Sequence, residues 1–289
     1  MIIVSGANGK LGRAVVRRLL DRVGPERIGV CVRDPERARA LAERGVRVRQ
    51  GDFADERSLA HAFEGASRVL VVSVDASGET ALRLHETAVN AAGKAGAERV
   101  VYTSHMGANP SSPFAPMVDH AATEVVLRNS GLAFTSLRNG FYAATTVMLL
   151  GGAVETGELA APEDGPVSWT SHDDLAEAAA VALTEDVLDG VTPALTGAAA
   201  IDLAGVAALA SEVTGRPIRR VVVSDEDYRA GLVAHGLTRH VADLLVGMFA
   251  ASRQGEFARV DPTLADLIGR PTVPVRDVLG AWAADSGLV

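Results

Sequence analysis

Three glycines near the start of the chain have a spacing that could hold the phosphates of a dinucleotide. The run Gly6-Ala7-Asn8-Gly9-Lys10-Leu11-Gly12 follows a short apolar stretch, residues 2–4, and precedes a stretch typical of a helix, residues 14–20. Glycine at such positions permits a tight turn, a close approach of the backbone to phosphate, and close packing of helix on strand. The helix that follows adds free N–H groups and the positive end of its dipole. The motif in this context predicts a dinucleotide site.

The residue that follows the second apolar stretch, 28–32, indicates which dinucleotide to expect. Sites for NAD carry an Asp or Glu there, which accepts hydrogen bonds from the ribose 2′-hydroxyl. This chain has Arg33 instead, with Asp34 one residue later. A guanidinium fork suits a 2′-phosphate, and Lys10 could add charge from the glycine loop. We therefore predict NADPH (NADP) as the cofactor; the alternative is that Arg33 is a solvated arginine at a strand end.

Polar residues also follow the later strands that the sequence predicts. Asp52-Phe53 comes after residues 46–50, and its carboxylate and ring could border the adenine; alternatively, the pair is a helix cap and a core phenylalanine. Ser73 ends the strand expected at 69–72, and Thr103-Ser104-His105 ends the one expected at 99–103. Ligands of open α/β sheets bind beyond the carboxyl ends of the strands. These residues are therefore candidates for cofactor binding.

The elements that must position these residues alternate regularly along the first half of the chain. Six strands are expected at residues 2–4, 28–32, 46–50, 69–72, 99–103 and 134–137, separated by helices at 14–20, 36–44, 56–63, 79–95 and 119–129. Strands that alternate with helices of this length indicate a parallel sheet wound on both faces. The predicted fold class is therefore α/β, a Rossmann-type doubly wound parallel sheet with a smaller mixed C-terminal substrate lobe.

The regular alternation ends after Gly140. Helices are expected at 147–154 and 225–255, a strand at 219–223, and an amphipathic helix at 173–184. We predict a dinucleotide-binding domain at residues 1–145, to which residues 165–185 return, and a smaller substrate-binding lobe at residues 146–289.

Composition excludes several classes of function. The formal net charge of the 289 residues is −8, which argues against a nucleic-acid or anionic-membrane partner. The single cysteine, Cys31, cannot form an internal disulfide and favours a reducing compartment. Structural zinc is not expected without further thiolates, and no other metal is predicted. The sequence has no secretory leader and no apolar stretch of membrane-spanning length, so we expect a cytoplasmic protein.

Three stretches of the sequence resemble a known family. They are Val4 to Gly12, Val32-Arg33-Asp34-Pro35, and the run from Thr123-Glu124 through Leu127-Arg128-Asn129-Ser130-Gly131-Leu132 to Thr135-Ser136-Leu137-Arg138-Asn139-Gly140-Phe141-Tyr142. The chain resembles the NmrA-like branch of the atypical short-chain dehydrogenases/reductases over its first 185 residues. Within that branch it is similar to the NADPH-dependent type 2 quinone oxidoreductases and to triphenylmethane reductase.

The resemblance implies a site that transfers hydride from NADPH to a quinone-like acceptor. It implies that Asn139, Phe141 and Tyr142 line the nicotinamide and substrate pocket, and that residues 103–105 approach the cofactor. The small-molecule partner is expected to be flat and aromatic or a quinone, and a homodimer is a further partner that the sequence allows.

The chain departs from the Tyr-x-x-x-Lys pair that typical dehydrogenases of this superfamily use. None of the three tyrosines has a lysine four residues later, because Lys10 and Lys94 are the only lysines. His120 stands where relatives often carry lysine, and Pro116 where the tyrosine would be. Dehydrogenation of simple alcohols is therefore not expected. A quinone needs less acid catalysis, because its reduced form is aromatic and water can protonate it.

Candidate catalytic residues are His120 and His105 as proton donors, with Tyr142 as a weaker candidate. A histidine with a pKa near neutrality suits that role. Alternatively, both histidines are ordinary polar residues, and we expect the other five to be structural. Two other functions are compatible with the sequence: a non-catalytic NmrA-like redox sensor that binds NADP(H) and acts through a protein partner, and a specialised biosynthetic reductase.

Overall fold

Seven parallel strands form one sheet, with β1 near its middle. The computed structural model describes residues 1–288. The strand order is β10-β6-β5-β4-β1-β2-β3, and every neighbouring pair is parallel. The strands are β1 (Ile2–Ser5), β2 (Ile28–Val32), β3 (Arg47–Gln50), β4 (Arg68–Val71), β5 (Arg99–His105), β6 (Ala133–Asn139) and β10 (Gly190–Leu195). The order reverses between β1 and β4, which is the switch point of a Rossmann-type sheet, so the predicted fold class is confirmed.

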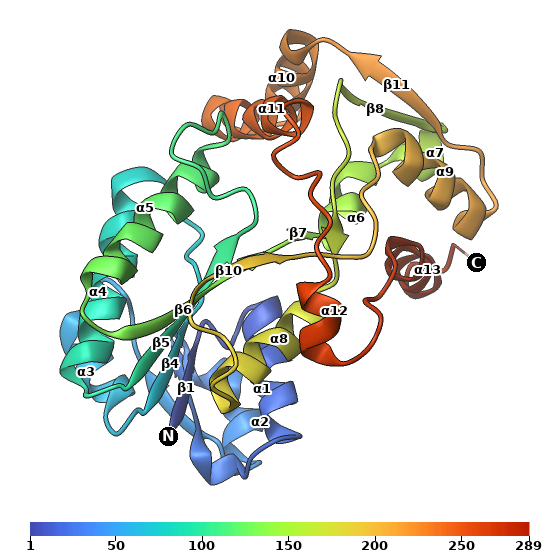
Figure 1. Cartoon of the computed structure of the whole chain (residues 1–289). Helices are drawn as coiled ribbons and strands as arrows, with labels where there is room; N and C mark the ends of the chain where they lie inside the picture. The colour runs from blue at the N-terminus through green and yellow to red at the C-terminus, as the bar shows by residue number, and fades with distance from the viewer. Residues whose placement is uncertain (289) are drawn as a thin grey trace. The chain divides into compact units, whose positions relative to one another are not determined.

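Helices cover both faces of this sheet (Figure 1). On one face lie α3 (Glu56–Phe63), α4 (Gly78–Lys94) and α5 (Ala115–Asn129); on the other lie α1 (Lys10–Leu20) and α8 (His172–Thr184). Two short turns of 3-10 helix, η1 (Pro25–Arg27) and η2 (Pro35–Ala38), and the short α2 (Arg39–Ala42) complete this part.

The alternation of side chains along the strands builds a core on each face. On the side of α3–α5, Ile3, Val69, Val71 and Val100 are fully buried together with Tyr102. On the opposite side α8 consists mainly of alanine and leucine, and nine of its thirteen residues are buried. Small side chains let this helix approach α1 and the sheet closely. Burial on both faces explains why β1, β2 and β4 are almost entirely apolar, whereas β3, at the edge of the sheet, contains two arginines and a glutamine.

The seventh strand, β10, was missed by the sequence analysis, which predicted six. It contains Pro193 and begins at Gly190, two residues that are rare in central strands. The strand lies at the edge of the sheet beside β6, and its register shifts between Val191 and Ala194. An edge strand tolerates proline because one side of it needs no hydrogen-bond partner. The proline and glycine in its sequence therefore explain why β10 was not predicted.

The chain divides into two compact units. The first contains residues 1–110, 116–139 and 172–195, and the second contains residues 111–115, 140–171 and 196–289. The first unit ends its main run at Asn139 rather than at residue 145, and the segment that returns to it is 172–195 rather than 165–185. The returning segment is longer because it supplies β10 as well as α8.

The second unit is mixed α and β. It contains two small parallel pairs, β8–β11 and β7–β9. The expected helix 147–154 is broken at Gly151, and the expected helix 225–255 is broken at Gly236, where φ is +91°. Its elements are β7 (Phe141–Tyr142), α6 (Ala144–Leu150), α7 (Ala153–Thr156), β8 (Glu158–Pro162), β9 (Trp169–Thr170), α9 (Leu203–Thr214), β11 (Arg219–Val223), α10 (Asp225–Ala234), α11 (Arg239–Arg253), α12 (Thr263–Ile268) and α13 (Val275–Asp285).

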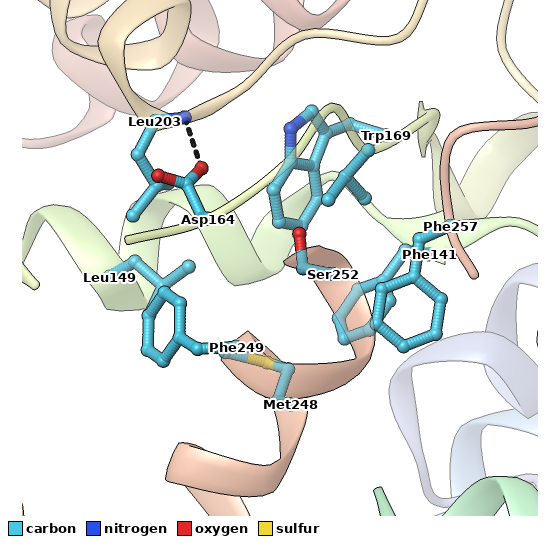
Figure 2. A pocket seen from close by; sticks show the side chains of 10 residues that line it. Phe141, Leu149, Asp164, Trp169, Leu203, Met248, Phe249, Ser252 and Phe257 are labelled. Carbon is cyan, nitrogen blue, oxygen red and sulfur yellow. Dashed lines mark hydrogen bonds between the residues drawn. The ribbon is translucent and has the colours of Figure 1, made fainter. Parts of the chain in front are cut away.

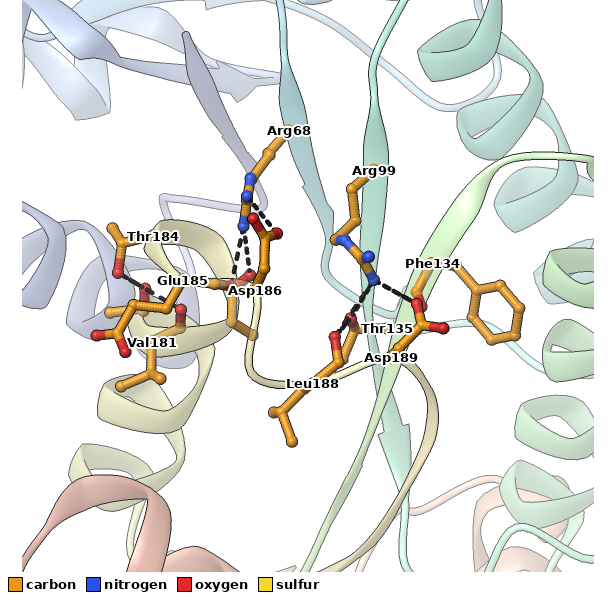
Figure 3. A network of polar contacts seen from close by, with 12 residues as sticks. Arg68, Arg99, Phe134, Thr135, Val181, Thr184, Glu185, Asp186, Leu188 and Asp189 are labelled. Carbon is orange, nitrogen blue, oxygen red and sulfur yellow. Dashed lines mark hydrogen bonds and ion pairs between the residues drawn. The ribbon is translucent and has the colours of Figure 1, made fainter.

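At the amino end of the sheet, Arg99 joins three segments of the first unit (Figure 3). Its Nη1 donates to the carbonyls of Phe134 (3.1 Å) and Leu188 (3.3 Å), to Thr135 Oγ1 (3.1 Å) and to Asp189 Oδ1 (2.8 Å). Because Arg99 begins β5, these bonds fasten β6 and the loop before β10 to the sheet.

Arg68, which begins β4, has a similar role beside it (Figure 3). It donates to the carbonyls of Ala182 (3.3 Å) and Glu185 (3.0 Å) and pairs with Asp186 Oδ1 at 2.6 Å. Cationic side chains stabilise the negative end of a helix dipole, so Arg68 caps the C-terminus of α8.

Among residues 1–288, no helix is long and apolar enough to cross a membrane.

Candidate functional site

The glycine loop of the first unit has a conformation that only glycine accommodates. Gly6 has a φ of +63°, and the amide of Gly9 donates to the Gly6 carbonyl at 2.8 Å. A Cβ on Gly12 would lie 2.4 Å from the Gly6 carbonyl oxygen, and one on Gly6 would lie 3.1 Å from Val72 Cβ. The backbone thus turns sharply at the end of β1 and leaves no space for side chains, as a phosphate cradle requires.

Helix α1 begins in this loop at Lys10, with Gly9 as its N-cap residue. No side chain caps this end, and its first turn contains no acidic residue. The first N–H groups of a helix have no partner within the helix, and together with the dipole they attract an anion. The eleven residues of α1 therefore present an open anion-binding end beside the glycine turn.

Arg33 and Asp34, which follow β2, differ in whether their side chains have partners in the protein. Asp34 Oδ1 accepts from the amide of Glu36 at 3.1 Å and caps η2, while the Asp34 carbonyl accepts from Asn8 Nδ2 at 2.8 Å. Arg33 is exposed, and its guanidinium has no carboxylate partner in the part of the chain that the structure describes. The one carboxylate at this strand end is therefore engaged in capping, whereas the guanidinium is open.

Asp52 and Phe53, at the end of β3, have local partners. Asp52 Oδ1 accepts from the amide of Ala54 at 2.9 Å, and its own amide bonds Ser58 Oγ at 2.9 Å. The residue that caps α3 is Asp55, not Asp52. Phe53 is partly buried against the core on the α3–α5 face. Asp52 is therefore not the helix cap of the structural alternative, whereas Phe53 does pack against the core as that alternative expected. Contact of either residue with the adenine stays a prediction.

Three consecutive amides at the end of β4 are each held by a side chain from a different element. The amides of residues 72–74 donate in turn to Ser5 Oγ of β1 (2.9 Å), Thr103 Oγ1 of β5 (2.8 Å) and His85 Nε2 of α4 (3.0 Å). The hydroxyl of Thr103 also donates to Ser73 Oγ at 3.3 Å. The segment that leaves β4 is therefore fixed in place beside Gly6, and Ser73 and Thr103 bond each other.

His85 is structural, as the sequence analysis expected. Its Nε2 accepts from Val74, so Nδ1 carries the proton and donates to Thr123 Oγ1 at 2.9 Å. Burial lowers the pKa of His85 to about 4, and the ring is therefore neutral at pH 7. The neutral ring joins α4, α5 and the end of β4.

His105 and His120 lie together at the end of β5. Their rings stack with centroids 6.1 Å apart, and His120 Nδ1 is 2.8 Å from the hydroxyl of Tyr102. Burial and the neighbouring His85 lower the pKa of His120 to about 4, although Glu124 acts in the opposite sense. Burial, together with His120, also lowers the pKa of His105 well below its ordinary value. Both imidazoles are thus neutral at pH 7, unlike the near-neutral pKa that the sequence analysis assigned to a proton donor.

Ser104 belongs to a buried network around Glu124. The carboxylate of Glu124, 1% exposed, accepts from Ser104 Oγ (2.9 Å), Ser136 Oγ (3.2 Å) and two nitrogens of Arg138 (2.9 and 2.7 Å). Burial alone would raise the pKa of Glu124, but these hydrogen bonds hold it below its ordinary value. The network fixes α5 against β5 and β6, and Ser104 has a structural partner within it.

Asn139, the last residue of β6, has a buried oxygen without a partner. The side chain is 2% exposed, and its Oδ1 accepts no hydrogen bond from residues 1–288. An unsatisfied buried amide oxygen costs about 1–3 kcal/mol, so it needs an explanation. A ligand that carries an N–H or O–H donor would satisfy it.

In the second unit, Phe141 packs in an aromatic cluster. Its ring lies 5.4 Å from Trp169 and 5.0 Å from Phe257, both in edge-on contact, and it stacks at 6.3 Å on Phe114. Phe141 is only 8% exposed, and Tyr142 is partly buried. As cofactor-binding and catalytic residues respectively, both stay predictions.

A small cavity lies beside this cluster (Figure 2). It measures about 10 Å³, space for about one water molecule. Its polar lining is satisfied: Asp164 Oδ2 accepts from the amide of Leu203 at 2.7 Å, and Ser252 Oγ donates to the Gly165 carbonyl at 2.9 Å. The other lining residues are Phe141, Leu149, Val167, Trp169, Met248, Phe249 and Phe257. A cavity of this size is part of the core and does not hold a flat aromatic molecule.

Two functional features escaped the sequence analysis. Tyr102 was considered only as a tyrosine that lacks a lysine four residues later, although it contacts His120 from the adjacent element. Ser5 lies between the expected apolar stretch and the glycine loop and was given no role of its own, although its hydroxyl oxygen accepts a hydrogen bond from the Val72 amide at the end of β4. Neither pairing has a sequence signal, because each joins residues of different elements.

No group of three metal-ligating side chains occurs among residues 1–288.

Comparisons with known proteins agree with this site. Residues 6–186 match a protein family described as NAD(P)H-binding. Quinone oxidoreductase 2 of Escherichia coli (strain K12) is 34% identical over 278 residues, which cover 96% of each protein. A crystal structure of NADPH-dependent quinone oxidoreductase from Escherichia coli, complexed with NADPH, has a TM-score of 0.92 at 32% identity and covers 98% of this chain and 99% of that one.

Triphenylmethane reductase from Citrobacter sp., complexed with NADP(H), has a TM-score of 0.90 at 31% identity and covers 98% of this chain and all of that one. The predicted resemblance is confirmed. These relatives also confirm the predictions of an NADPH-dependent reductase and of NADPH as its cofactor.

Proposed function

Since the chain belongs to the NAD(P)H-binding family, we propose that it reduces quinone-like or other conjugated small molecules with NADPH. The observation that carries this proposal is a set of polar groups without protein partners at the carboxyl end of the sheet. These groups are the guanidinium of Arg33, the buried Oδ1 of Asn139 and the N–H groups that begin α1. Their chemistry matches a ligand that carries phosphates at one end and a hydrogen-bond donor at the other.

The residues present fit NADPH. The backbone at Gly6, Gly9 and Gly12, with the first turn of α1, would hold the pyrophosphate. Arg33 would bind the 2′-phosphate, with Lys10 adding charge, because the Arg33 guanidinium is open whereas the Asp34 carboxylate is engaged in capping η2. The orphan oxygen of Asn139 suits the N–H of a carboxamide. When bound, the dinucleotide supplies a hydride, which is a proton with two electrons.

The histidines support a hydrogen-bonding role rather than that of a charged acid. His120 and His105 are neutral at pH 7, so neither is an imidazolium that could act as a general acid. A neutral imidazole can still donate a hydrogen bond to an oxygen that becomes negative as hydride arrives. The proton that completes a hydroquinone then comes from water. This division of labour suits quinones, whose reduced anions are weak bases.

We further propose that the second unit selects the acceptor. The proposal rests on Phe141 and Trp169, which lie edge-on to each other in this unit and are of the aromatic type that binds flat rings. Four statements stay predictions that solution measurements must test. They are the role of Tyr142 in that selection, a cytoplasmic location, a homodimer and the lack of a nucleic-acid partner.

The experiment is NADPH oxidation followed by absorbance, with purified protein and a panel of quinones and aromatic dyes, repeated with NADH. Acceptor-dependent turnover that favours NADPH is the expected result. Oxidation at the same rate without protein or without acceptor gives the background. If NADPH binds, as seen by fluorescence, but no acceptor is reduced, the reductase proposal fails and a redox sensor with a protein partner replaces it.

A further inference from the structure

The pair Tyr102–His120 has one nitrogen in a fixed hydrogen bond and one that is open. His120 Nδ1 lies 2.8 Å from the phenol oxygen of Tyr102. His120 Nε2 has no hydrogen-bond partner among residues 1–288, although the ring is partly buried at the carboxyl end of the sheet. A polar nitrogen in that position is available to a ligand.

The direction of the fixed hydrogen bond decides what the open nitrogen can do. A phenol loses its proton with a pKa of about 10, whereas a neutral imidazole is a far weaker acid and a better acceptor. The hydroxyl of Tyr102 is therefore the donor and Nδ1 the acceptor. Because a neutral imidazole has one proton, that proton must then be on Nε2, which makes Nε2–H a donor.

The surroundings keep this arrangement in place. Tyr102 is fully buried in β5, and its ring meets that of His85 from α4 edge-on at 5.2 Å. On the other side, His120 from α5 stacks on His105 from β5 at 6.1 Å. The charged and titratable groups that face His120 are thus His85, His105, Tyr102 and, one helical turn on, Glu124. Burial, together with His85, outweighs the opposite effect of Glu124 on the pKa of His120 and keeps the ring uncharged at pH 7.

We propose that Tyr102 is a positioning residue that holds His120 in its Nε2–H tautomer, and that this N–H donates a hydrogen bond to the acceptor oxygen that gains charge in the reaction. This rests on the proposed reductase function. The acceptor receives a hydride with both electrons from the dinucleotide, which is oxidised, and the reduced anion takes its proton from water. His120 and Tyr102 keep their protons throughout. The pair thus takes over the hydrogen bond that the missing Tyr-x-x-x-Lys would provide.

The first test is Tyr102→Phe, which removes only the hydroxyl and retains the ring that packs on His85. We expect kcat to fall roughly tenfold, with the Kd of NADPH within twofold of the wild type. Removing a hydrogen-bond donor to a developing oxyanion directly costs about 10²–10³-fold, and a positioning residue costs less. Tyr228→Phe is the matched control, because it removes a hydroxyl from α10 in the second unit, and it should leave kcat unchanged.

A structural readout separates positioning from a mere loss of stability. ¹⁵N NMR of the histidine rings distinguishes Nε2–H from Nδ1–H, and it works without substrate. The wild type should show His120 as Nε2–H, and Tyr102→Phe should show a mixture of the two tautomers. A kcat within twofold of the wild type, or an unchanged tautomer in Tyr102→Phe, would overturn the proposal.

The second test replaces His120 itself. Gln offers an amide N–H near the position of Nε2–H, whereas Leu offers none. We expect His120→Gln to retain at least tenfold more activity than His120→Leu, and equal activity of the two variants would contradict the proposal. If the wild type reduces no acceptor at all, the reductase function fails, while the tautomer measurement still decides the role of Tyr102.

Discussion

The two ends of the central sheet both carry many polar side chains, but these differ in whether the protein itself satisfies them. At the amino end, Arg99 and Arg68 each donate to backbone carbonyls and pair with an aspartate. At the carboxyl end, Arg33 has no ion pair among residues 1–288, and Asn139 Oδ1 is buried without a donor. Arginine alone therefore does not indicate a binding site.

The difference teaches how to separate structure from function in one sheet. A polar group that is satisfied by its own chain stabilises the fold, and removing it costs stability. A buried polar group that is unsatisfied lowers stability until a ligand arrives, whereas an exposed one is hydrated and costs little. Substitution of the open groups at the carboxyl end should therefore change ligand affinity, and substitution of the paired arginines at the amino end should change the free energy of unfolding.

The largest expected effect is at Gly12. In Gly12→Ala the new Cβ would lie 2.4 Å from the Gly6 carbonyl oxygen and 2.9 Å from Ala7 Cα, both backbone atoms. The glycine turn must shift, so we expect the Kd of NADPH to rise at least about 100-fold, since the turn is what brings backbone N–H groups to the phosphates. Fluorescence titration with NADPH measures this.

The control for Gly12 is Gly231→Ala. Gly231 lies inside α10, and a Cβ there meets nothing within 4 Å. Alanine in a helix interior is about 1 kcal/mol better than glycine, so stability should rise slightly and NADPH affinity should not change. Similar losses of affinity in both variants would contradict a phosphate cradle at residues 6–12.

Arg99→Ala should have the largest effect at the amino end. The side chain is 16% exposed, and its removal takes one donor from the carbonyl of Phe134 and one from that of Leu188, which keeps the hydroxyl of Thr135. We expect the free energy of unfolding in urea to fall by about 2–3 kcal/mol, with NADPH affinity unchanged at temperatures where the variant is folded. Arg39→Ala, which removes an exposed pair with Glu43, should cost less than about 0.5 kcal/mol. A loss of NADPH affinity in Arg99→Ala would erase the contrast between the two ends.

The carboxyl end should also make stability depend on pH through buried histidines. Burial lowers the pKa of His85 to about 4, against about 6.5 in an unfolded chain. Between these values only the unfolded chain binds the proton, so stability is complete above pH 6.5 and falls as the pH falls towards 4. At pH 5 the loss from this one histidine is about 2 kcal/mol.

Urea unfolding between pH 7 and pH 5 tests this effect. His85→Gln cannot titrate and should show a shallower loss of stability over that range, whatever its stability at pH 7. His61→Gln changes an exposed histidine of α3 and should keep the wild-type slope. An identical slope in His85→Gln and the wild type would show that His85 is not the neutral link between α4, α5 and β4.

Local sequence pattern was enough to predict the sheet and the positions of strand-end residues, because parallel strands buried on both faces are apolar and their loops carry the ligand groups. It did not reveal β10, whose proline and glycine are tolerated only because the strand lies at an edge. Nor did it reveal which polar residues are engaged. Thr103 and Ser104 were candidates for the cofactor, but their partners come from other elements: the amide of Ser73 and the carboxylate of Glu124. Partners of that kind follow from tertiary structure and have no signature in sequence spacing.

The smallest expected effect is at Arg33, and it gives the sharpest test of NADPH binding against NADH binding. Arg33→Ala removes a guanidinium that has no protein partner in the described residues, so stability should change by less than about 0.5 kcal/mol. The 2′-phosphate loses its bidentate donor, and the Kd of NADPH should rise about tenfold, while that of NADH, which has no such phosphate, should change less than twofold. Arg37→Ala, four residues along on the exposed surface of η2, is the matched control and should alter neither. Equal losses for NADPH and NADH would mean that Arg33 acts on a group the two cofactors share, and the open end of β2 would then not be where the protein tells them apart.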